Sequence, residues 1–411
     1  MAETSVLAAE ASARPDAVGA TRTAETRARA AEASAGPDAV GATRTAETRA
    51  RAAEKPTPTD AFVELRDINK TFGDFQASRH VSFGVARGTL AALLGPSGSG
   101  KTTILRMIAG LETPDTGDIL IDGRRVNDVA PSERGIGFVF QSYALFRYMT
   151  VRENVAFGLR VKHEPEARVR ERVDELLELI DLADLGNRYP GQLSGGQRQR
   201  VAFARAIAPS PRVLLLDEPF AAIDAKIRKE LRSWLKQTIR RLGITSIFVT
   251  HDQEEAIEVA DSIILTHAGR IEQVGTPAQI YARPQTKFAA GFFGDSAHVD
   301  DLSRLGSFSG VRGPAIVRSE HVSVLAPGEP FRYAASVVSG VVRDVSFRGR
   351  SVEVEVDVAG ERLRSTRSPE APVLNSGDMV GVFVHRLFAE GDDGLVRPVE
   401  NDSLREESVV I

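Results

Sequence analysis

The sequence predicts an α/β domain with a parallel sheet, followed by a small all-β domain. Two observations support the α/β part: the buried apolar run 90–94 leads into a glycine-rich turn, and a segment with helical apolar spacing follows at 103–109. A third supports the all-β part, because from about residue 296 the chain consists of short alternating runs separated by glycines. At 411 residues, of which 42% are hydrophobic, the chain has room for two or three domains.

The composition excludes several kinds of site and partner. The chain contains no cysteine, which rules out disulfides, thiolate metal sites and cysteine nucleophiles. Its formal net charge of −4 gives no electrostatic case for nucleic acid as the main partner, since a phosphate backbone requires a basic face. No apolar run in the sequence approaches the ~20 residues that span a bilayer. We therefore expect that, if the protein works at a membrane, a partner holds it there.

The first 59 residues differ from the rest of the chain. Residues 8–29 recur at 30–51 with a constant offset of 22, and the only change is from Arg14 to Gly36. The repeat has almost no large apolar side chains, so we expect 1–59 to be a dispensable disordered tail and linker. A transit peptide is the alternative, but the acidic residues in both copies argue against it.

The glycine-rich turn after the first buried run has the pattern of a phosphate-binding loop. Glycines let successive backbone N–H groups point toward one anion, and the helix that begins there adds its partial positive charge. Lys101 can reach the outer phosphates of a nucleoside triphosphate, and the Thr102 hydroxyl can ligate Mg²⁺. The predicted nucleotide-binding residues of this segment are Gly95, Pro96, Ser97, Gly98, Ser99, Gly100, Lys101, Thr102 and Thr103.

A second buried run ends in two carboxylates. Residues 213–216 are apolar throughout, which suits a central parallel strand, and Asp217 and Glu218 follow at its carboxyl end, where α/β folds bind ligands. Alone, such an acidic pair more often caps a helix. After a phosphate loop, Asp217 is expected to hold Mg²⁺ through a water, and Glu218 to polarise the attacking water as a general base.

Two further side chains gain a role from this context. His251 ends the apolar run 247–250, and at the end of a strand parallel to the one before Glu218 it would face the same terminal phosphate. Elsewhere, a lone histidine is usually just a satisfied polar residue. Phe72 lies 29 residues before Lys101, and its ring is either a core aromatic or a stacking partner of the nucleotide base. The other motifs favour the second interpretation.

A second glycine turn precedes the helix expected at 198–207. Ser194 is a good N-cap, and the two glycines after it leave backbone N–H groups uncovered, so this turn either binds an anion or simply caps the helix. Because two anion-binding turns accompany one nucleotide, each phosphate group is expected to lie between the loop of one copy and the cap of another. The residues predicted to contact nucleotide in this way are Ser194, Gly195, Gly196 and Gln197.

With these motifs in order along the chain, the sequence resembles the ATP-binding subunits of ATP-binding-cassette (ABC) transporters over residues 60–295. The resemblance implies a P-loop NTPase cassette, with a RecA-like core and a helical subdomain at about 142–205. It implies that two copies dimerise head to tail around two ATP molecules, and that Gln141 touches Mg²⁺ in the catalytic site where the cassette meets a membrane subunit. It also carries a role over to Asp224, expected at the dimer interface, although Ala221 stands where the family usually has serine or glycine.

Three segments narrow the resemblance. Residues 142–151, 228–235 and 250–256 resemble importer ATPases of the sulfate/thiosulfate group, although relatives that drive molybdate, sugar or polyamine uptake share much of them. The implied function is MgATP hydrolysis coupled to sulfate or thiosulfate uptake. The implied partners are two transmembrane permease subunits and, indirectly, an extracytoplasmic solute-binding protein, with the ATPase peripheral on the cytoplasmic face of the cell membrane. The rival is a soluble cassette ATPase of DNA repair or translation, but such proteins commonly carry two cassettes or long insertions.

The last third, 296–411, is expected to be a β-rich regulatory domain. Residues 352–358 alternate strictly between valine and acid, and other short runs lie at 315–318, 341–345 and 379–384. These runs predict a small barrel of the OB or TOBE type. An OB-like barrel could alternatively bind nucleic acid, but the outward acids of 352–358 argue against that. We expect the final residues, 401–411, to fray.

Overall fold

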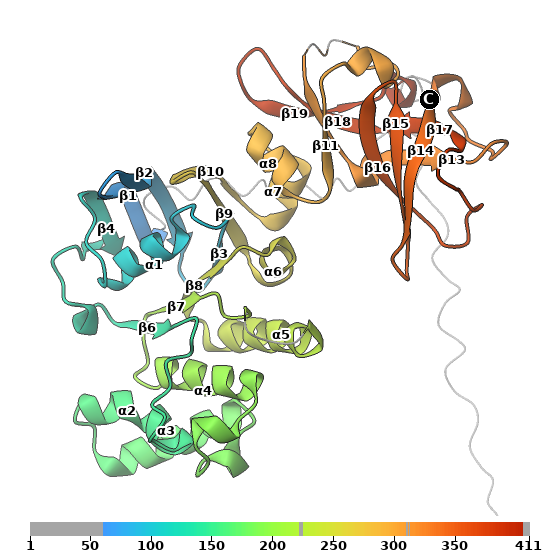
Figure 1. The fold of residues 1–411 in the computed structure, drawn as a ribbon. Helices are drawn as coiled ribbons and strands as arrows, with labels where there is room; N and C mark the ends of the chain where they lie inside the picture. The colour runs from blue at the N-terminus through green and yellow to red at the C-terminus, as the bar shows by residue number, and fades with distance from the viewer. Residues whose placement is uncertain (1–60, 222–224, 310, 312, 406–411) are drawn as a thin grey trace, which may run out of the picture. The chain divides into compact units, whose positions relative to one another are not determined.

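The computed structural model describes residues 61–221, 225–309, 311 and 313–405. The N-terminal repeat and Asp224, for which the sequence makes predictions, lie outside the described residues. Within the described part, an α/β region is followed by a region made mainly of strands, as Figure 1 shows. This arrangement confirms the predicted fold class.

The central element is a six-stranded sheet in the order β10-β9-β3-β8-β7-β6. β9, β3, β8, β7 and β6 run parallel, and β10 pairs antiparallel with β9. The three runs predicted as buried strands, 90–94, 213–216 and 247–250, lie in β3, β7 and β8, and every residue of these strands is buried, as expected for strands covered on both faces. The strands are β3 Leu90–Leu94, β6 Ile136–Val139, β7 Val213–Asp217, β8 Thr245–Thr250, β9 Ser262–His267 and β10 Arg270–Gly275.

A second, antiparallel sheet has the order β2-β1-β4-β5. Helix α1 shares one apolar core with both sheets, because Ile104, Leu105, Met107 and Ile108 are buried among side chains of β1, β2, β3 and β8. In the sequence, α1 begins immediately after the glycine turn that follows the carboxyl end of β3. These elements are β1 Ala61–Phe72, β2 Phe75–Ala86, β4 Thr116–Ile121, β5 Arg124–Arg125 and α1 Lys101–Ala109.

Helices fill the chain between β6 and β7, in the range where the sequence predicts a helical subdomain, and Figure 1 shows them grouped together. The apolar faces of these helices form one core with α5, α6 and one face of the six-stranded sheet. Helix residues of this core include Val155, Leu176, Val201 and Leu235. Alternate residues of β3 thus face two different cores. The helices between β6 and β7 are α2 Val151–Val161, α3 Glu166–Leu179 and α4 Gly195–Ile207, whereas α5 Ala225–Leu242 follows β7 and α6 Gln253–Val259 follows β8.

Two short helices, α7 Pro277–Ala282 and α8 Lys287–Phe292, precede the strand region. That region contains the sheets β11-β12-β18-β19 and β13-β17-β14-β15-β16. In β15 the valines point into the core and the acids outward, where Glu355 pairs with Arg364 and Asp357 with Arg343. The strands are β11 Ser296–Val299, β12 Ala315–Arg318, β13 Val322–Leu325, β14 Val338–Phe347, β15 Val352–Val358, β16 Glu361–Arg367, β17 Met379–Val384, β18 Arg386–Glu390 and β19 Val396–Glu400.

The chain end departs from the prediction of fraying. Asn401 is fully buried: its backbone N–H donates to the His385 carbonyl at 2.9 Å, and its side-chain amide donates to the Val384 carbonyl at 3.0 Å. A short helix, α9 Asp402–Arg405, follows. One buried amide ties this segment to the end of β17, and such a contact leaves no periodic signal in the sequence. The prediction is therefore wrong for 401–405, and 406–411 lie outside the described residues.

Candidate functional site

The glycines of the phosphate loop are required by close backbone contacts. Gly98 and Gly100 have positive φ angles of 79° and 89°, which residues other than glycine rarely adopt. A Cβ at Gly100 would lie 2.1 Å from the carbonyl oxygen of Ala77, and one at Gly95 would lie 2.2 Å from that of Thr266. The loop is thus wedged between β2 and β9, and this packing fixes its curvature.

Lys101 folds back into this loop. Its Nζ donates to the Gly95 carbonyl at 2.8 Å and to the Pro96 carbonyl at 2.7 Å. The side chain is buried, and burial lowers the pKa of the Lys101 ammonium. The Ser99 hydroxyl shares a hydrogen bond of 2.9 Å with Thr266 of β9. The arrangement places a cation at the centre of the loop, where the sequence predicts that phosphate oxygens bind.

Thr102 and Asp217 meet at the ends of α1 and β7. The Thr102 hydroxyl donates to Asp217 Oδ1 at 3.1 Å, and Asp217 is 6% exposed. Burial raises the pKa of the Asp217 carboxyl. Within the described residues no group of three or more His, Cys, Asp or Glu side chains is placed to hold a metal ion. A hydroxyl beside a single carboxylate fits Mg²⁺, which usually takes one or two carboxylates together with substrate phosphates and waters.

The carboxylate of Glu218 lies between two predicted partners. Gln141 Nε2 donates to Glu218 Oε2 at 2.8 Å, and His251 Nδ1 lies 3.2 Å from Glu218 Oε1. The backbone of Glu218 has a φ of 44°, an unusual value for a residue other than glycine, and such backbone strain is concentrated at functional sites. The structure therefore brings together three residues that the sequence assigned to catalysis, from the ends of β6, β7 and β8.

Phe72 lies at the tip of the β1–β2 hairpin. Its ring is 45% exposed and is therefore not a core aromatic, and Lys70 Nζ lies 4.9 Å from the ring centroid. Phe75, 56% exposed, is its direct partner across the hairpin, so the two rings lie on the same face. Sequence reasoning missed Phe75, although the two-residue turn between the phenylalanines was the available signal.

The second glycine turn is a helix cap, as predicted. Ser194 Oγ accepts from the Gln197 backbone N–H at 3.3 Å, while Gln197 Oε1 accepts from the Ser194 N–H at 2.9 Å. In the part of the chain that the structure describes, no hydrogen bond or ion pair joins this turn to the phosphate loop. The turn belongs to the α2–α4 group, whereas the loop belongs to α1, and Figure 1 shows these as separate parts of the cassette.

Arg205 is a site-supporting residue that the sequence did not reveal. From α4 it donates to the carbonyls of Tyr143 at 2.9 Å and Ala144 at 2.6 Å, both of which have positive φ angles. Its guanidinium also lies 5.4 Å from the ring centroid of Phe146. Arg205 thus holds the loop that follows Gln141. An arginine inside an otherwise apolar stripe was the only sequence signal.

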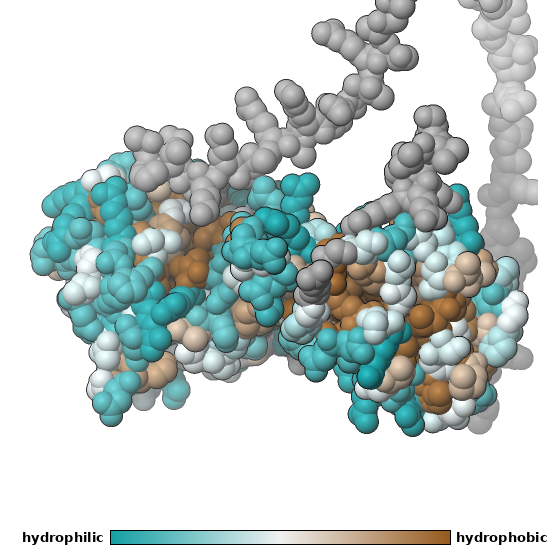
Figure 2. Space-filling view, turned by 90° about the horizontal axis from the view of Figure 1, so that it is seen from above, coloured by the Kyte–Doolittle hydropathy of each residue, from teal (hydrophilic) through white to brown (hydrophobic). Residues whose placement is uncertain are grey.

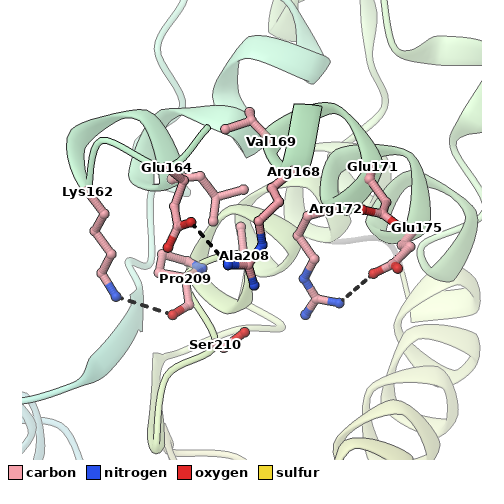
Figure 3. A pocket seen from close by; sticks show the side chains of 11 residues that line it. Lys162, Glu164, Arg168, Val169, Glu171, Arg172, Glu175, Ala208, Pro209 and Ser210 are labelled. Atoms are coloured by element: carbon pink, nitrogen blue, oxygen red, sulfur yellow. Dashed lines mark hydrogen bonds and ion pairs between the residues drawn. The ribbon is translucent and has the colours of Figure 1, made fainter. Parts of the chain in front are cut away.

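A surface cavity of about 480 Å³ lies elsewhere, between α2, α3 and the end of α4, as Figure 3 shows. Its charged groups are largely paired: Lys162 donates to the Pro209 carbonyl, Arg168 lies near Glu164, and Arg172 contacts Glu175. None of the predicted site residues lines it. Its lining residues are Leu159, Lys162, Glu164, Arg168, Val169, Glu171, Arg172, Glu175, Ala208, Pro209 and Ser210.

The fold and the site together define a phosphate-loop ATPase with an appended β domain. Comparison with protein-family models gives the same result: the ABC transporter model matches residues 78–221, and the TOBE domain model matches 315–386. The chain belongs to the ABC transporter family, as an ATP-hydrolysing subunit. No helix among the described residues has both the length and the apolar character needed to cross a bilayer.

Curated relatives extend over most of the chain. The sulfate/thiosulfate import ATP-binding protein CysA of Bradyrhizobium diazoefficiens is 47% identical over 80% of this chain and 99% of its own length. The protein of the same name from Methylococcus capsulatus is 49% identical over 82% of this chain and 97% of its own length. Among solved structures, cbiO1 from Clostridium perfringens, described as part of an ABC transporter complex, is 31% identical, with a TM-score of 0.51 over 54% of this chain and 91% of its own.

Proposed function

We propose that this chain is the ATPase subunit of a sulfate/thiosulfate importer. The observation that carries the catalytic part is the Glu218 carboxylate, held by Gln141 and His251 beside the Thr102–Asp217 pair. The cargo is supported by the similarity to sulfate/thiosulfate import proteins across nearly their whole length.

The proposal gives each site residue a chemical role. Lys101 leaves the loop carbonyls and donates to the outer phosphate oxygens, while the loop N–H groups bind the remaining oxygens. Thr102 and Asp217, together with Gln141, would hold Mg²⁺, which would supply positive charge against the phosphate oxygens. Glu218 accepts a proton from the attacking water, and Gln141 and His251 orient its two oxygens.

The nucleotide base and the partner copy complete the site. Phe72 stacks on the base, for which an exposed ring at a hairpin tip is suited. Ser194, Gly195, Gly196 and Gln197 of a second copy close over the phosphates, together with Asp224. A head-to-tail dimer is consistent with the separation of the two glycine turns within one chain. Two permease subunits then hold the dimer on the cytoplasmic face of the membrane.

The direct test is uptake in cells that lack the chain. Restoring the wild-type gene should restore uptake of radiolabelled sulfate, whereas Glu218→Gln should not. Uptake of molybdate, sugars and polyamines should be unchanged by the deletion. Loss of one of these instead of sulfate would reassign the cargo but keep the ATPase, while full uptake with Glu218→Gln would remove the catalytic assignment.

A further inference from the structure

The side-chain amide of Gln253 bonds to two backbone groups of a distant segment. Its Nε2 donates to the Phe292 carbonyl, and its Oε1 accepts from the Gly294 N–H at 3.0 Å. Gln253 is the first residue of α6, and the segment that it holds lies at the end of α8. Because one side-chain amide bonds to both a carbonyl and an N–H group, it fixes the orientation of the bonded segment relative to α6 as well as its distance.

The held segment leads directly into the C-terminal domain. Gly294 has a positive φ of 73°, and the next carbonyl, that of Asp295, accepts from the Ser319 N–H at 2.8 Å. β11 then begins at Ser296 and pairs along its whole length with β12. Between the two bonds of Gln253, Phe293 is fully buried in the cassette core. A displacement of the C-terminal sheet therefore reaches the amide of Gln253 through a short and packed path.

Arg318, the last residue of β12, makes this junction stiff. It is fully buried, lies 4.5 Å from the ring centroids of both Tyr281 and Phe388, and donates to the Ala290 carbonyl at 3.0 Å and the Tyr281 carbonyl at 2.7 Å. The arginine thus joins the C-terminal sheet to both α7 and α8. Arg318 and Gln253 both bond to the backbone at or next to α8, so the Phe292–Gly294 segment cannot hinge freely between the domains.

At its other end, Gln253 lies two residues after His251. The residue between them, Asp252, is fixed by hydrogen bonds: its N–H donates to Thr250 Oγ1 at 3.0 Å, and its Oδ1 accepts from the Glu255 N–H at 3.1 Å. The start of α6 is therefore rigid from the strand end to Gln253. His251, which lies 3.2 Å from the Glu218 carboxylate, moves with it.

We propose that Gln253 is a positioning residue that couples the C-terminal β domain to His251. Resting on the proposed function, this inference assigns the route by which that domain regulates ATP turnover. When the C-terminal domain shifts, the Phe292–Gly294 segment pulls the Gln253 side chain through its two hydrogen bonds. The start of α6 then moves, and His251 moves toward or away from Glu218. The same link works in reverse, so nucleotide in the site stabilises the entry into the C-terminal domain.

The chain offers a matched control. Gln273 of β10 makes the same kind of paired bonds just after the end of α7: its Nε2 donates to the Arg283 carbonyl at 3.0 Å, and its Oε1 accepts from the Gln285 N–H at 3.0 Å. Gln273 does not lie in the segment that carries His251. Gln253→Met and Gln273→Met both keep side-chain length and remove two hydrogen bonds, so they share a structural cost and differ in their link to the site.

The experiment measures amide hydrogen exchange in the full-length chain with and without magnesium and a non-hydrolysable ATP analogue, adenylyl imidodiphosphate. In the wild type, the analogue should slow exchange in peptides covering 95–103, 251–259 and 292–299. Gln253→Met should keep the first two effects and lose at least about two thirds of the third. Gln273→Met should keep all three. In ATPase assays, Gln253→Met should change kcat at least threefold with KM within twofold, and Gln273→Met should change neither.

The possible failures are distinct. Absence of protection at 95–103 in the wild type would remove the nucleotide site itself, and the inference with it. Protection at 95–103 without any at 292–299 would overturn the inference alone. Full protection at 292–299 in Gln253→Met, or an equal loss in Gln273→Met, would show that the amide is merely structural.

Discussion

Gln141 and Glu218 are 77 residues apart in the sequence, yet the amide of the first donates to the carboxylate of the second at 2.8 Å. The bond links the end of β6 to the end of β7, two neighbouring parallel strands. Gln141 also begins the loop that Arg205 holds through the Tyr143 and Ala144 carbonyls. Arg205 therefore supports the loop whose first residue orients the Glu218 carboxylate, the group that we propose as the general base.

Glu218→Gln should separate nucleotide binding from turnover. The amide has nearly the same shape as the carboxylate and keeps an acceptor oxygen for Gln141, but it cannot take a proton from water. We expect kcat to fall by about 10²- to 10⁴-fold, the usual contribution of a general base, with nucleotide affinity within a few-fold of wild type. Phosphate release and equilibrium binding of ATP measure the two effects.

The matched control for that substitution is Glu254→Gln. Glu254 lies three residues after His251 in the sequence, but its side chain is 87% exposed and pairs with Arg232. The Glu254→Gln variant should hydrolyse ATP at the wild-type rate. If Glu218→Gln hydrolysed ATP as fast as Glu254→Gln, another group would have to act as the base.

Lys101→Ala should weaken nucleotide binding. In the structure this ammonium bonds to two loop carbonyls, those of Gly95 and Pro96, and we expect it to exchange them for phosphate oxygens when nucleotide binds. A hydrogen bond to a charged group contributes ~1.5–3 kcal/mol, so the dissociation constant should rise by about one to two decades. Lys162→Ala, which removes a lysine from the α2–α3 cavity, is the control and should bind normally. Equal affinity of the two variants would contradict the role of Lys101.

The two central loop glycines should differ in their tolerance of alanine. Both have positive φ, which costs an alanine roughly 1–2 kcal/mol. At Gly98 a Cβ would meet nothing within 4 Å, whereas at Gly100 it would lie 2.1 Å from the Ala77 carbonyl. Gly100→Ala must therefore push the loop away from β2, and we expect at least about tenfold weaker nucleotide binding than in Gly98→Ala, measured by fluorescence anisotropy. Matching affinities would mean that the loop absorbs the methyl group without moving.

Local signals in the sequence were sufficient for the elements that make the site. The run 90–94 is β3 without any change of boundary, because a strand buried on both faces has no polar residue inside it. Ser194 caps α4 with the expected reciprocal bonds to Gln197. In each case the structure depends on neighbours in the chain or on a pattern of period two or 3.6, and such patterns are visible in one sequence.

Contacts between distant side chains and backbone groups were not predictable in this way. Arg205, Gln253 and Asn401 each bond to carbonyl or N–H groups at least 16 positions away, and nothing in the sequence around them indicates which groups these are. Asn401 even lies in a segment predicted to fray. The partner of a buried amide is set by the tertiary fold, so its sequence position carries no periodic signal.

The stability of the C-terminal domain should fall on acidification. Burial lowers the pKa of the His321 and His385 imidazoles below their usual 6.5. His321 Nδ1 is buried and has no hydrogen-bond partner among the described residues, and His385 Nε2 lies 2.8 Å from Ser323 Oγ. Below pH 6.5 the unfolded chain binds protons that the folded domain does not, so stability decreases with falling pH until the folded pKa is reached, by at most about 1.4 kcal/mol per pH unit for each histidine. Thermal melting between about pH 7.5 and 5.5 should show a steeper loss for the wild type than for the double variant His321→Gln, His385→Gln. Carboxylates titrate alike in both proteins, so identical slopes would mean that the two imidazoles take up protons at the same pH in the folded domain as in the unfolded chain.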